Sequence, residues 1–305
     1  MSARLRGAPA WLPTALLVAV AVVAAWTRVL QARESLWLDE LHTAWVAMGS
    51  WGEVAARSMA GNQSAPFFAL EWALVHTLGA SELVLRLPSL VAGVALVGAL
   101  YTLARAWTGS AWIGLVTAWL AAADPQAIYY GTEARPYALV QLLGVLHVAL
   151  FAELVRRPTV AKRVASVVGA AVLFHLHYTT ALVFGGEVAW YAWARLRGRV
   201  GYRLRDAAID ATIAVALMAP AVAVLRLLAA RRHNWELFVD QRPPWIAILM
   251  LPWAATALVA TAAVSVWRRV RRATPAAGRD RGDVVRCLLC WLVVPVALAW
   301  VSTAV

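Results

Sequence analysis

The chain has 305 residues, of which 62% are hydrophobic and 14% are charged, and its mean hydropathy is +0.68. A soluble domain of this length does not normally carry so much apolar surface, so these values indicate a polytopic membrane protein. The formal net charge of +12 lies mainly in short arginine-rich segments between apolar stretches. That distribution follows the positive-inside rule and argues against a nucleic-acid partner.

Apolar stretches long enough to cross a bilayer recur along the chain. They predict one all-α, polytopic membrane domain over residues 1–305 with about nine transmembrane helices. The expected spans lie near residues 11–29, 86–106, 110–128, 137–155, 164–183, 180–196, 207–226, 245–267 and 286–304. The fifth and sixth share a boundary, which predicts a tight hairpin near 175–180.

The orientation follows from the distribution of arginine. Arg4 and Arg6 precede the first span, and no small-residue cleavage site is evident before the acidic loop, so we expect an uncleaved anchor with a cytoplasmic N-terminus. Alternation of the spans then assigns three basic segments to the cytoplasm: 156–163, 195–205 and 267–286. Most of the Asp and Glu residues fall in the extracytoplasmic segments. Any active site is therefore expected at the extracytoplasmic face of the cell membrane.

The first extracytoplasmic segment, residues 30–85, is long and patterned. Residues 42–59 carry apolar side chains at roughly helical spacing and predict one helix lying at the membrane interface. Residues 65–79 are too short, and with Glu71 and His76 too polar, for a confident span, so they predict a second interfacial or re-entrant helix.

Two adjacent acids, Asp39 and Glu40, stand in "SLWLDELHTAW" just after the first span. Adjacent carboxylates at a membrane surface repel each other and cost desolvation energy, which suggests a general base or a metal ligand facing a polar substrate. The alternative is that they cap or solvate an interfacial helix starting at Leu41, because acids favour a helix N-terminus.

A second polar group lies in "DPQAIYYGTEARPYAL", residues 124–139. Pro136 suits the first turn of the helix that follows, and the spacing of Glu133 and Tyr137 predicts that they share one face of it. Arg135 could bind a phosphate with its planar fork. The alternative is a surface ion pair between Glu133 and Arg135, which would contribute little.

Arg86 is the first residue of the second span, at its outer end, where the positive-inside rule disfavours an arginine. It could reach the headgroups or bind the phosphate of a lipid-linked substrate. The loop 226–245 is also basic and outside, which either a phosphate-binding rim or an incorrect local topology would explain.

His175 and His177 are the sequence's main candidates for a metal site. They alternate at the outer end of a span and could ligate a divalent metal, although no carboxylate lies beside them in the sequence. No other cofactor is indicated. Cys287 and Cys290 lie in an apolar helix and are interpreted as packing residues.

Four motifs in order, "WLDE", "SAPFFAL", "LRLPS" and "YYGTEARPYAL", resemble those of membrane glycosyltransferases of the protein O-mannosyltransferase and lipid A aminoarabinose transferase type. The resemblance covers residues 35–139 and implies a GT-C-like fold. It implies a sugar donor linked to polyprenyl phosphate and a glycan, lipid or protein acceptor at the outer face.

The resemblance also implies residue roles. Asp39 matches the acid that acts as base or orients the acceptor, with Glu40 beside it, and Arg86 matches an arginine that holds the carrier phosphate. The remaining residues assigned to substrate or phosphate binding are Glu133, Arg135 and Tyr137, together with His177 in "LHYTTALV", which is similar to a His-Tyr segment of the family. Two departures stand out. "NQSAPFF" has a single proline, and the chain ends at "WLVVPVALAWVSTAV", where relatives usually continue.

The chemistry implied is a single displacement at the anomeric carbon, with Asp39 deprotonating the acceptor and arginines stabilising the departing phosphate. The sequence contains no Gly-rich phosphate loop, which fits a donor that is not a free nucleotide. The alternatives are a transporter or flippase for a polar lipid and an inactive membrane scaffold.

Overall fold

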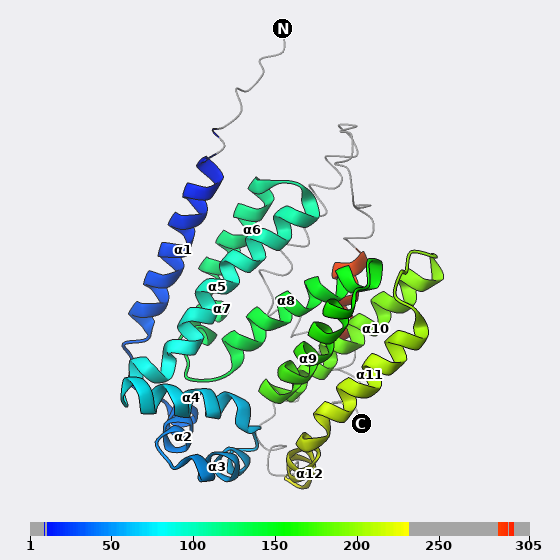
Figure 1. The fold of residues 1–305 in the computed structure, drawn as a ribbon. Coiled ribbons are helices and arrows are strands. Elements are labelled where there is room, and N and C mark those ends of the chain that lie inside the picture. The colour runs from blue at the N-terminus through cyan, green and yellow to red at the C-terminus, as the bar shows by residue number, and fades with distance from the viewer. Residues whose placement is uncertain (1–8, 10, 232–285, 292, 296–305) are drawn as a thin grey trace, which may run out of the picture.

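The computed structural model describes residues 9, 11–231, 286–291 and 293–295 (Figure 1). Throughout this part of the chain every regular element is helical and none is a strand, so the all-α prediction is confirmed there. The predicted span 245–267 and most of the predicted loop 226–245 lie outside the described residues.

Residues 286–291 and 293–295 are helical, and twelve further α-helices lie between residues 12 and 230. In chain order they are α1 (Leu12–Gln31), α2 (Leu38–Ala47), α3 (Val54–Ala60), α4 (Ala65–Leu78), α5 (Glu82–Thr108), α6 (Ala111–Ala123), α7 (Pro125–Tyr130), α8 (Tyr137–Arg156), α9 (Val160–Leu176), α10 (Ala181–Leu196), α11 (Leu204–Met218) and α12 (Val222–Ala230). Three short 3₁₀ turns join them: η1 (Trp51–Glu53), η2 (Tyr178–Thr180) and η3 (Ala219–Ala221).

Four of these units are long and apolar enough to cross a membrane: α1, α5, α8 and the nearly continuous unit Leu204–Ala230, which contains α11, η3 and α12. A helix needs about 20 residues to cross the hydrocarbon core. Helix α6 is apolar but shorter, with 13 residues, and α9 and α10 have 17 and 16 residues. The chain therefore has the character of a membrane protein, and the number of about nine spans stays a prediction.

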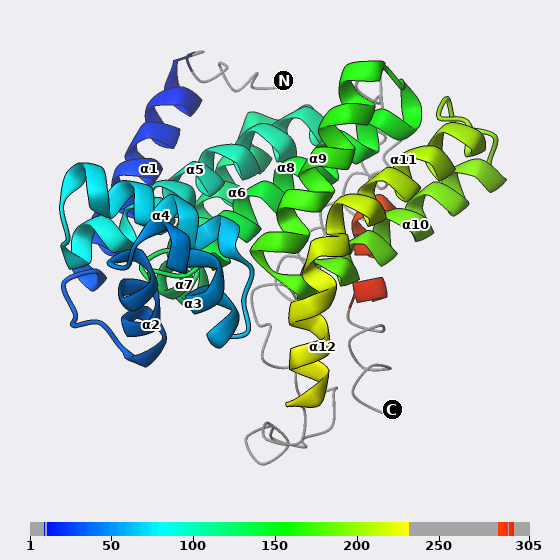
Figure 2. The same cartoon turned by 60° about the horizontal axis from the view of Figure 1, so that its bottom comes forward.

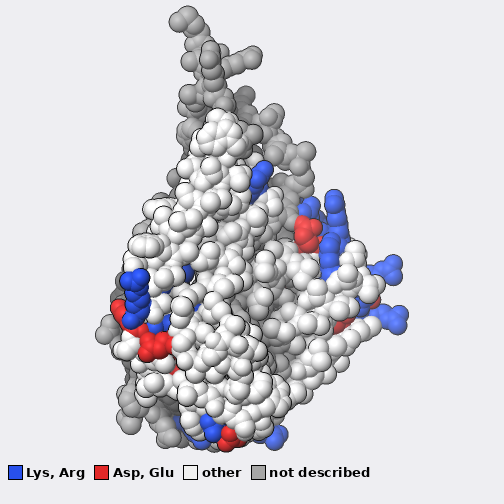
Figure 3. All heavy atoms as spheres, turned by 60° about the vertical axis from the view of Figure 1, so that its left-hand side comes forward, with Lys and Arg blue, Asp and Glu red and all other residues white. Residues whose placement is uncertain are grey.

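Helices α2, α3, α4 and α7 gather at one end of the longer helices, where α1 ends and α5 and α8 begin (Figures 1 and 2). We call this the α2–α4 end. The connections between α8 and α9 and between α10 and α11 lie at the far end of these helices (Figure 1). The two basic segments 156–163 and 195–205 contain these connections, and they therefore share one end, as the alternation of spans predicts. The face in Figure 3 is mostly uncharged, with its charged side chains in a few groups.

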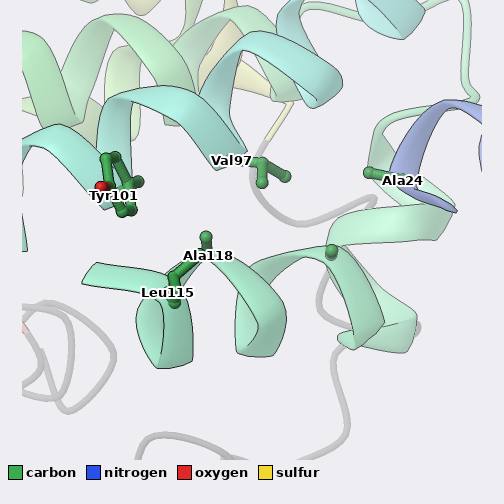
Figure 4. Packing of buried hydrophobic residues seen from close by; sticks show 6 residues of the cluster. Ala24, Val97, Tyr101, Leu115 and Ala118 are labelled. Carbon is green, nitrogen blue, oxygen red and sulfur yellow. The ribbon is translucent and has the colours of Figure 1, made fainter. Parts of the chain in front are cut away.

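Small side chains let α1, α5 and α6 pack closely (Figure 4). The cluster they form consists of Ala24 from α1, Val97 and Tyr101 from α5, and Leu115, Ala118 and Ala122 from α6. Gly114 on α6 lies directly against Tyr101, and a Cβ at residue 114 would stand 2.8 Å from the tyrosine ring. Close backbone approach at small residues is a common way to pack helices without a hydrophobic driving force between them.

Arg28, near the end of α1, is fully buried and ties this helix to α7. Its Nη1 donates to the Ala24 carbonyl and its Nη2 to the Ala127 carbonyl, both at 3.1 Å. Gly93 and Gly131 make room for it, because a Cβ at either position would stand 2.7 or 2.6 Å from the arginine Nε. The arginine therefore fixes where the segment after α7 begins.

Ionisable side chains link α8 to α10 and α9 to α11. His147 of α8 and Glu187 of α10 are both buried, with Nε2 3.0 Å from Oε1, and Gly169 of α9 lies against the histidine ring. Nearer the far end, Arg163 of α9 donates to both oxygens of Asp210 of α11 at 2.8 Å. Ionisable residues within a membrane bundle normally pair in this way because an isolated charge there is costly.

The prediction of one helix over residues 42–59 is wrong, because the structure has two helices there. Helix α2 ends at Ala47, and α3 begins at Val54 after the short turn η1. The backbone N–H and hydroxyl of Ser50 donate to Glu53 at 2.9 and 2.7 Å, and these bonds lower the pKa of Glu53 to about 2. A local capping interaction thus starts a new helix, although the apolar pattern of the sequence continues without a break through these residues. The predicted helix over 65–79 is confirmed as α4, whereas its position at a membrane interface stays a prediction.

Glu71 of α4 is fully buried, and neither of its carboxylate oxygens has a hydrogen-bond partner among the described residues. It shares the buried side of α4 with Phe67, Phe68 and Val75. Burial without a partner disfavours the charged form and raises the pKa of Glu71 to about 9. The side chain is therefore a neutral carboxylic acid at pH 7.

The free energy of unfolding should fall as the pH rises from about 4.5 to about 9, because the unfolded chain releases the Glu71 proton near 4.5 and the folded protein only near 9. Glu71→Gln should remove this contribution, which is at most about 1.4 kcal/mol per pH unit. The measurement is unfolding in detergent micelles at several pH values across that range. Glu82→Gln, which changes an exposed glutamate, is the control and should keep the wild-type slope. An unchanged slope in Glu71→Gln would contradict the prediction.

Candidate functional site

A buried ion pair between Glu40 and Arg86 joins α2 to α5 at the α2–α4 end. Glu40 lies in the first turn of α2 and Arg86 near the start of α5. The arginine Nη2 is 2.6 Å from Oε2 and its Nε donates to Oε1 at 2.8 Å. The Glu40 side chain is 1% exposed and the Arg86 side chain 4%. This bidentate geometry is the strongest form of an arginine–carboxylate contact.

Every donor of Arg86 is engaged. A guanidinium has five N–H groups, and two of those of Arg86 serve Glu40. The others donate to carbonyls of the segment that follows α1: Ala32 at 2.7 Å, Glu34 at 2.5 Å and Ser35 at 3.3 Å. A phosphate could therefore bind Arg86 only by breaking these bonds. In this structure the predicted phosphate ligand Arg86 is part of the scaffold.

Glu40 is equally occupied, and it sets the position of the segment 131–136. Besides Arg86, its carboxylate accepts from the backbone N–H groups of Trp37 at 3.3 Å and Ala134 at 2.8 Å. The first contact caps α2, which begins at Leu38 and not at Leu41 as expected. The two acids predicted as one catalytic pair thus separate. Glu40 is buried in the scaffold, and Asp39 points outward.

The bond from Ala134 to Glu40 brings their chain neighbours together. Asp39 precedes Glu40, and Arg135 follows Ala134, so the two meet: Nη2 of Arg135 is 3.7 Å from the Asp39 carboxylate and Nη1 is 3.5 Å from its carbonyl. Ser89, one turn after Arg86 on α5, donates to the Arg135 carbonyl at 2.9 Å. The motifs "WLDE", "LRLPS" and "TEARP" therefore form one connected structure.

Asp39 and Arg135 differ strongly in their exposure to solvent. The Asp39 side chain is 42% exposed and the Arg135 side chain 7%. The Nε of Arg135 is buried without a hydrogen-bond partner in the described part of the chain. Its two Nη groups also face the side-chain amide of Gln63. Unlike Arg86, Arg135 is therefore not fully hydrogen-bonded by the residues that the structure describes.

Glu133 is buried beside this pair but is not bonded to it. Neither of its oxygens has a hydrogen-bond partner among the described residues, and the alternative ion pair with Arg135 does not form. Burial raises the pKa of Glu133, and the nearby Glu133 carboxyl raises that of Tyr129 to about 12. The expectation that Glu133 and Tyr137 share a helix face is wrong, because α8 begins only at Tyr137 and residues 131–136 form turns.

Aromatic rings complete the surroundings of Arg135. The guanidinium carbon lies 5.9 Å from the centre of the Tyr137 ring, which in turn lies 5.0 Å from Tyr130 and 5.6 Å from His177. Burial, and then the charge of Arg135, lower the pKa of His177. Tyr137 thus lies beside Arg135, and His177 lies in contact with Tyr137.

The two histidines considered as metal ligands have separate partners. Nε2 of His175 is 3.0 Å from the Leu217 carbonyl, and Nδ1 of His177 is 2.7 Å from the Thr179 hydroxyl. Within the described ranges, no group of three or more His, Cys, Asp and Glu side chains could hold a metal ion. The divalent metal considered from the sequence therefore has no ligand set in this part of the protein.

The connector 61–64, between α3 and α4, contributes residues to the site that the sequence did not indicate. Gln63 faces Arg135, and the Ser64 hydroxyl is 2.6 Å from the Tyr178 hydroxyl. The only signal in the sequence is a short polar run, "GNQS", between two apolar helices. Such a run reads equally well as an ordinary loop.

The arrangement combines an exposed carboxylate, a histidine, several tyrosine rings and a buried guanidinium that the described residues do not fully satisfy. It can accept a proton at Asp39 and bind an anion at Arg135. No family model, curated protein or solved structure matches the chain, so the function is argued from this geometry and from the sequence motifs.

Proposed function

We propose that the chain is a membrane glycosyltransferase that moves a sugar from a polyprenyl-phosphate carrier to a hydroxyl or amine acceptor. The observation that carries the proposal is the pair formed by the exposed Asp39 carboxylate and the buried Arg135 guanidinium, 3.7 Å apart. A base and an anion-binding group at that separation suit a reaction in which a proton leaves one partner and a phosphate leaves the other. The four motifs that resemble the transferase family support it.

In the proposed reaction Asp39 takes the proton of the acceptor as its oxygen or nitrogen bonds to the anomeric carbon. The bond from that carbon to the phosphate oxygen breaks, and polyprenyl phosphate leaves with the electron pair. Arg135 stabilises the negative charge that develops on it. A single displacement inverts the anomeric centre and needs no second carboxylate as nucleophile. Glu40 and Arg86 act as positioning residues that hold the 131–136 segment against α2.

The proposal includes the topology. With about nine spans and a cytoplasmic N-terminus in the cell membrane, the α2–α4 end is the extracytoplasmic end, and a lipid-linked donor would reach Asp39 from the outer leaflet. The basic connections at the far end of the helices, in segments 156–163 and 195–205, support this orientation.

A transporter or flippase for a polar lipid is the second candidate. The buried pair of His147 and Glu187 between α8 and α10 favours it, because paired ionisable residues inside a membrane bundle often line a substrate or proton pathway. The pair also joins two helices directly, so it serves a transferase equally well as a structural contact.

The test is reconstitution of the chain in liposomes with polyprenyl-phosphate sugars labelled in the sugar. A transferase releases unlabelled polyprenyl phosphate and moves the label to an acceptor. A flippase moves the intact labelled lipid between leaflets without breaking the bond to the sugar. Movement of intact lipid without sugar transfer would overturn the proposal in favour of the second candidate.

A further inference from the structure

The connector 61–64 crosses the candidate site and is fastened on both sides of Gln63. Arg231, at the end of α12, donates to the Asn62 side-chain oxygen at 2.8 Å. On the other side, the Ser64 hydroxyl is 2.6 Å from that of Tyr178. Asn62 has a φ of 60°, a left-handed conformation that asparagine tolerates better than most residues. The backbone of the connector is thus held in place, while the side chain of Gln63 reaches Arg135 between the two anchors.

The Gln63 side chain occupies the donors of Arg135 that would meet an anion. With its oxygen turned toward the guanidinium, the orientation that the surrounding donors require, the amide accepts from Nη1 at 3.1 Å and also from Nη2. One neutral oxygen thus takes two guanidinium donors, which is the arrangement that a phosphate or carboxylate oxygen adopts on arginine. A charged acceptor would bind these donors more strongly than a neutral amide does.

The described residues satisfy fewer of the hydrogen-bond donors of Arg135 than of Arg86. Its side chain is 7% exposed, its Nε has no partner within the described ranges, and its contacts with Asp39 are long, at 3.7 Å to the carboxylate and 3.5 Å to the carbonyl. A buried guanidinium is normally satisfied by its neighbours, as Arg86 is. The Nη groups of Arg135 are thus held by a neutral amide and by long contacts to Asp39, and a charged acceptor could replace the amide.

We propose that Gln63 is the resident occupant of an anion site on Arg135, and that a phosphate ester binds there by displacing the glutamine side chain. This proposal deepens the proposed function, because the phosphate of the lipid-linked donor would be the ligand. Displacement requires only rotation of the Gln63 side chain, since Asn62 and Ser64 hold the backbone on either side. Gln63 thereby satisfies Arg135 in the empty site and competes with the ligand for it.

The experiment measures the dissociation constants of dodecyl phosphate and of inorganic phosphate for the purified full chain in detergent micelles. Gln63→Ala removes the competitor and should bind dodecyl phosphate about 10-fold more tightly, the effect of one hydrogen bond to a charged group. Gln63→Glu places a carboxylate against Arg135 and should weaken binding by at least about 10-fold. Arg135→Gln should abolish binding. Gln126→Ala, which truncates an exposed glutamine of α7 away from Arg135, should bind as the wild type does.

The two ligands distinguish the source of the phosphate. Binding of dodecyl phosphate alone indicates a lipid-linked ligand, whereas equal binding of inorganic phosphate indicates recognition of the phosphate group itself. Unchanged or weaker binding in Gln63→Ala, or unchanged binding in Gln63→Glu, would overturn the proposal. Because the assay needs no sugar transfer, tight binding without transfer would leave the anion site standing and refute only the proposed function.

Discussion

Replacing Asp39 by asparagine should slow sugar transfer by about 10²–10⁴-fold while leaving the fold intact, because the variant loses a general base and little else. The Asp39 side chain is 42% exposed, and its ionic contact with Arg135 is long at 3.7 Å. Asparagine has the same shape but cannot take a proton from the acceptor. The measurement is the initial rate of label transfer from a polyprenyl-phosphate sugar in reconstituted liposomes.

Asp124→Asn is the matched control for this prediction. Asp124 is another aspartate at the α2–α4 end, where its carboxylate accepts from the backbone N–H groups of Gln126 and Ala127 and caps α7. Asparagine is as good a helix cap as aspartate, so this variant should transfer sugar at the wild-type rate. A folded Asp39→Asn protein with an undiminished rate would remove Asp39 from the proposed mechanism.

Replacing Glu40 by alanine should lower the free energy of unfolding by about 3–5 kcal/mol, the usual cost of removing one partner of a buried ion pair. The change would leave Arg86 charged and buried, and it would leave the Ala134 N–H without its acceptor. Because Ala134 holds the neighbouring Arg135 against Asp39, transfer should also fall in whatever protein remains folded. The measurement is denaturant unfolding in micelles, followed by tryptophan fluorescence.

Glu34→Ala controls for the general effect of losing an acid in this neighbourhood. Its side chain is exposed, and only its backbone carbonyl serves Arg86. A surface substitution of this kind should change stability by no more than about 0.5 kcal/mol. Equal losses in Glu40→Ala and Glu34→Ala would show that the buried pair is not what holds this end together.

The helices were predictable where local signals suffice. Hydropathy predicts a span over 137–155, and the structure has α8 over Tyr137–Arg156. The helix expected over 65–79 is α4, which ends where Gly79 adopts a φ of 92°. The prediction failed over 42–59, because Ser50 and Glu53 start a new turn within an apolar pattern that looks continuous.

The candidate site was predictable as a set of residues but not as a set of roles. The four motifs indicate that Asp39, Arg86 and Arg135 belong together, and the structure joins all three segments. From the sequence both arginines are equivalent candidates for a phosphate. Their difference depends on partners such as Glu40 and Ala32, 46 and 54 residues from Arg86, which no local pattern specifies.

By itself the sequence determined that this protein is helical, that its helices suit a membrane and that polar residues cluster near residues 39 and 133. Those properties follow from hydropathy, spacing and capping, which act over a few residues. Only the tertiary structure decided that Arg86 is saturated, that Arg135 has a donor without a partner among the described residues, and that Gln63 lies against Arg135. Whether a buried donor is satisfied depends on every group packed around it, and the fold assembles those groups from distant parts of the chain.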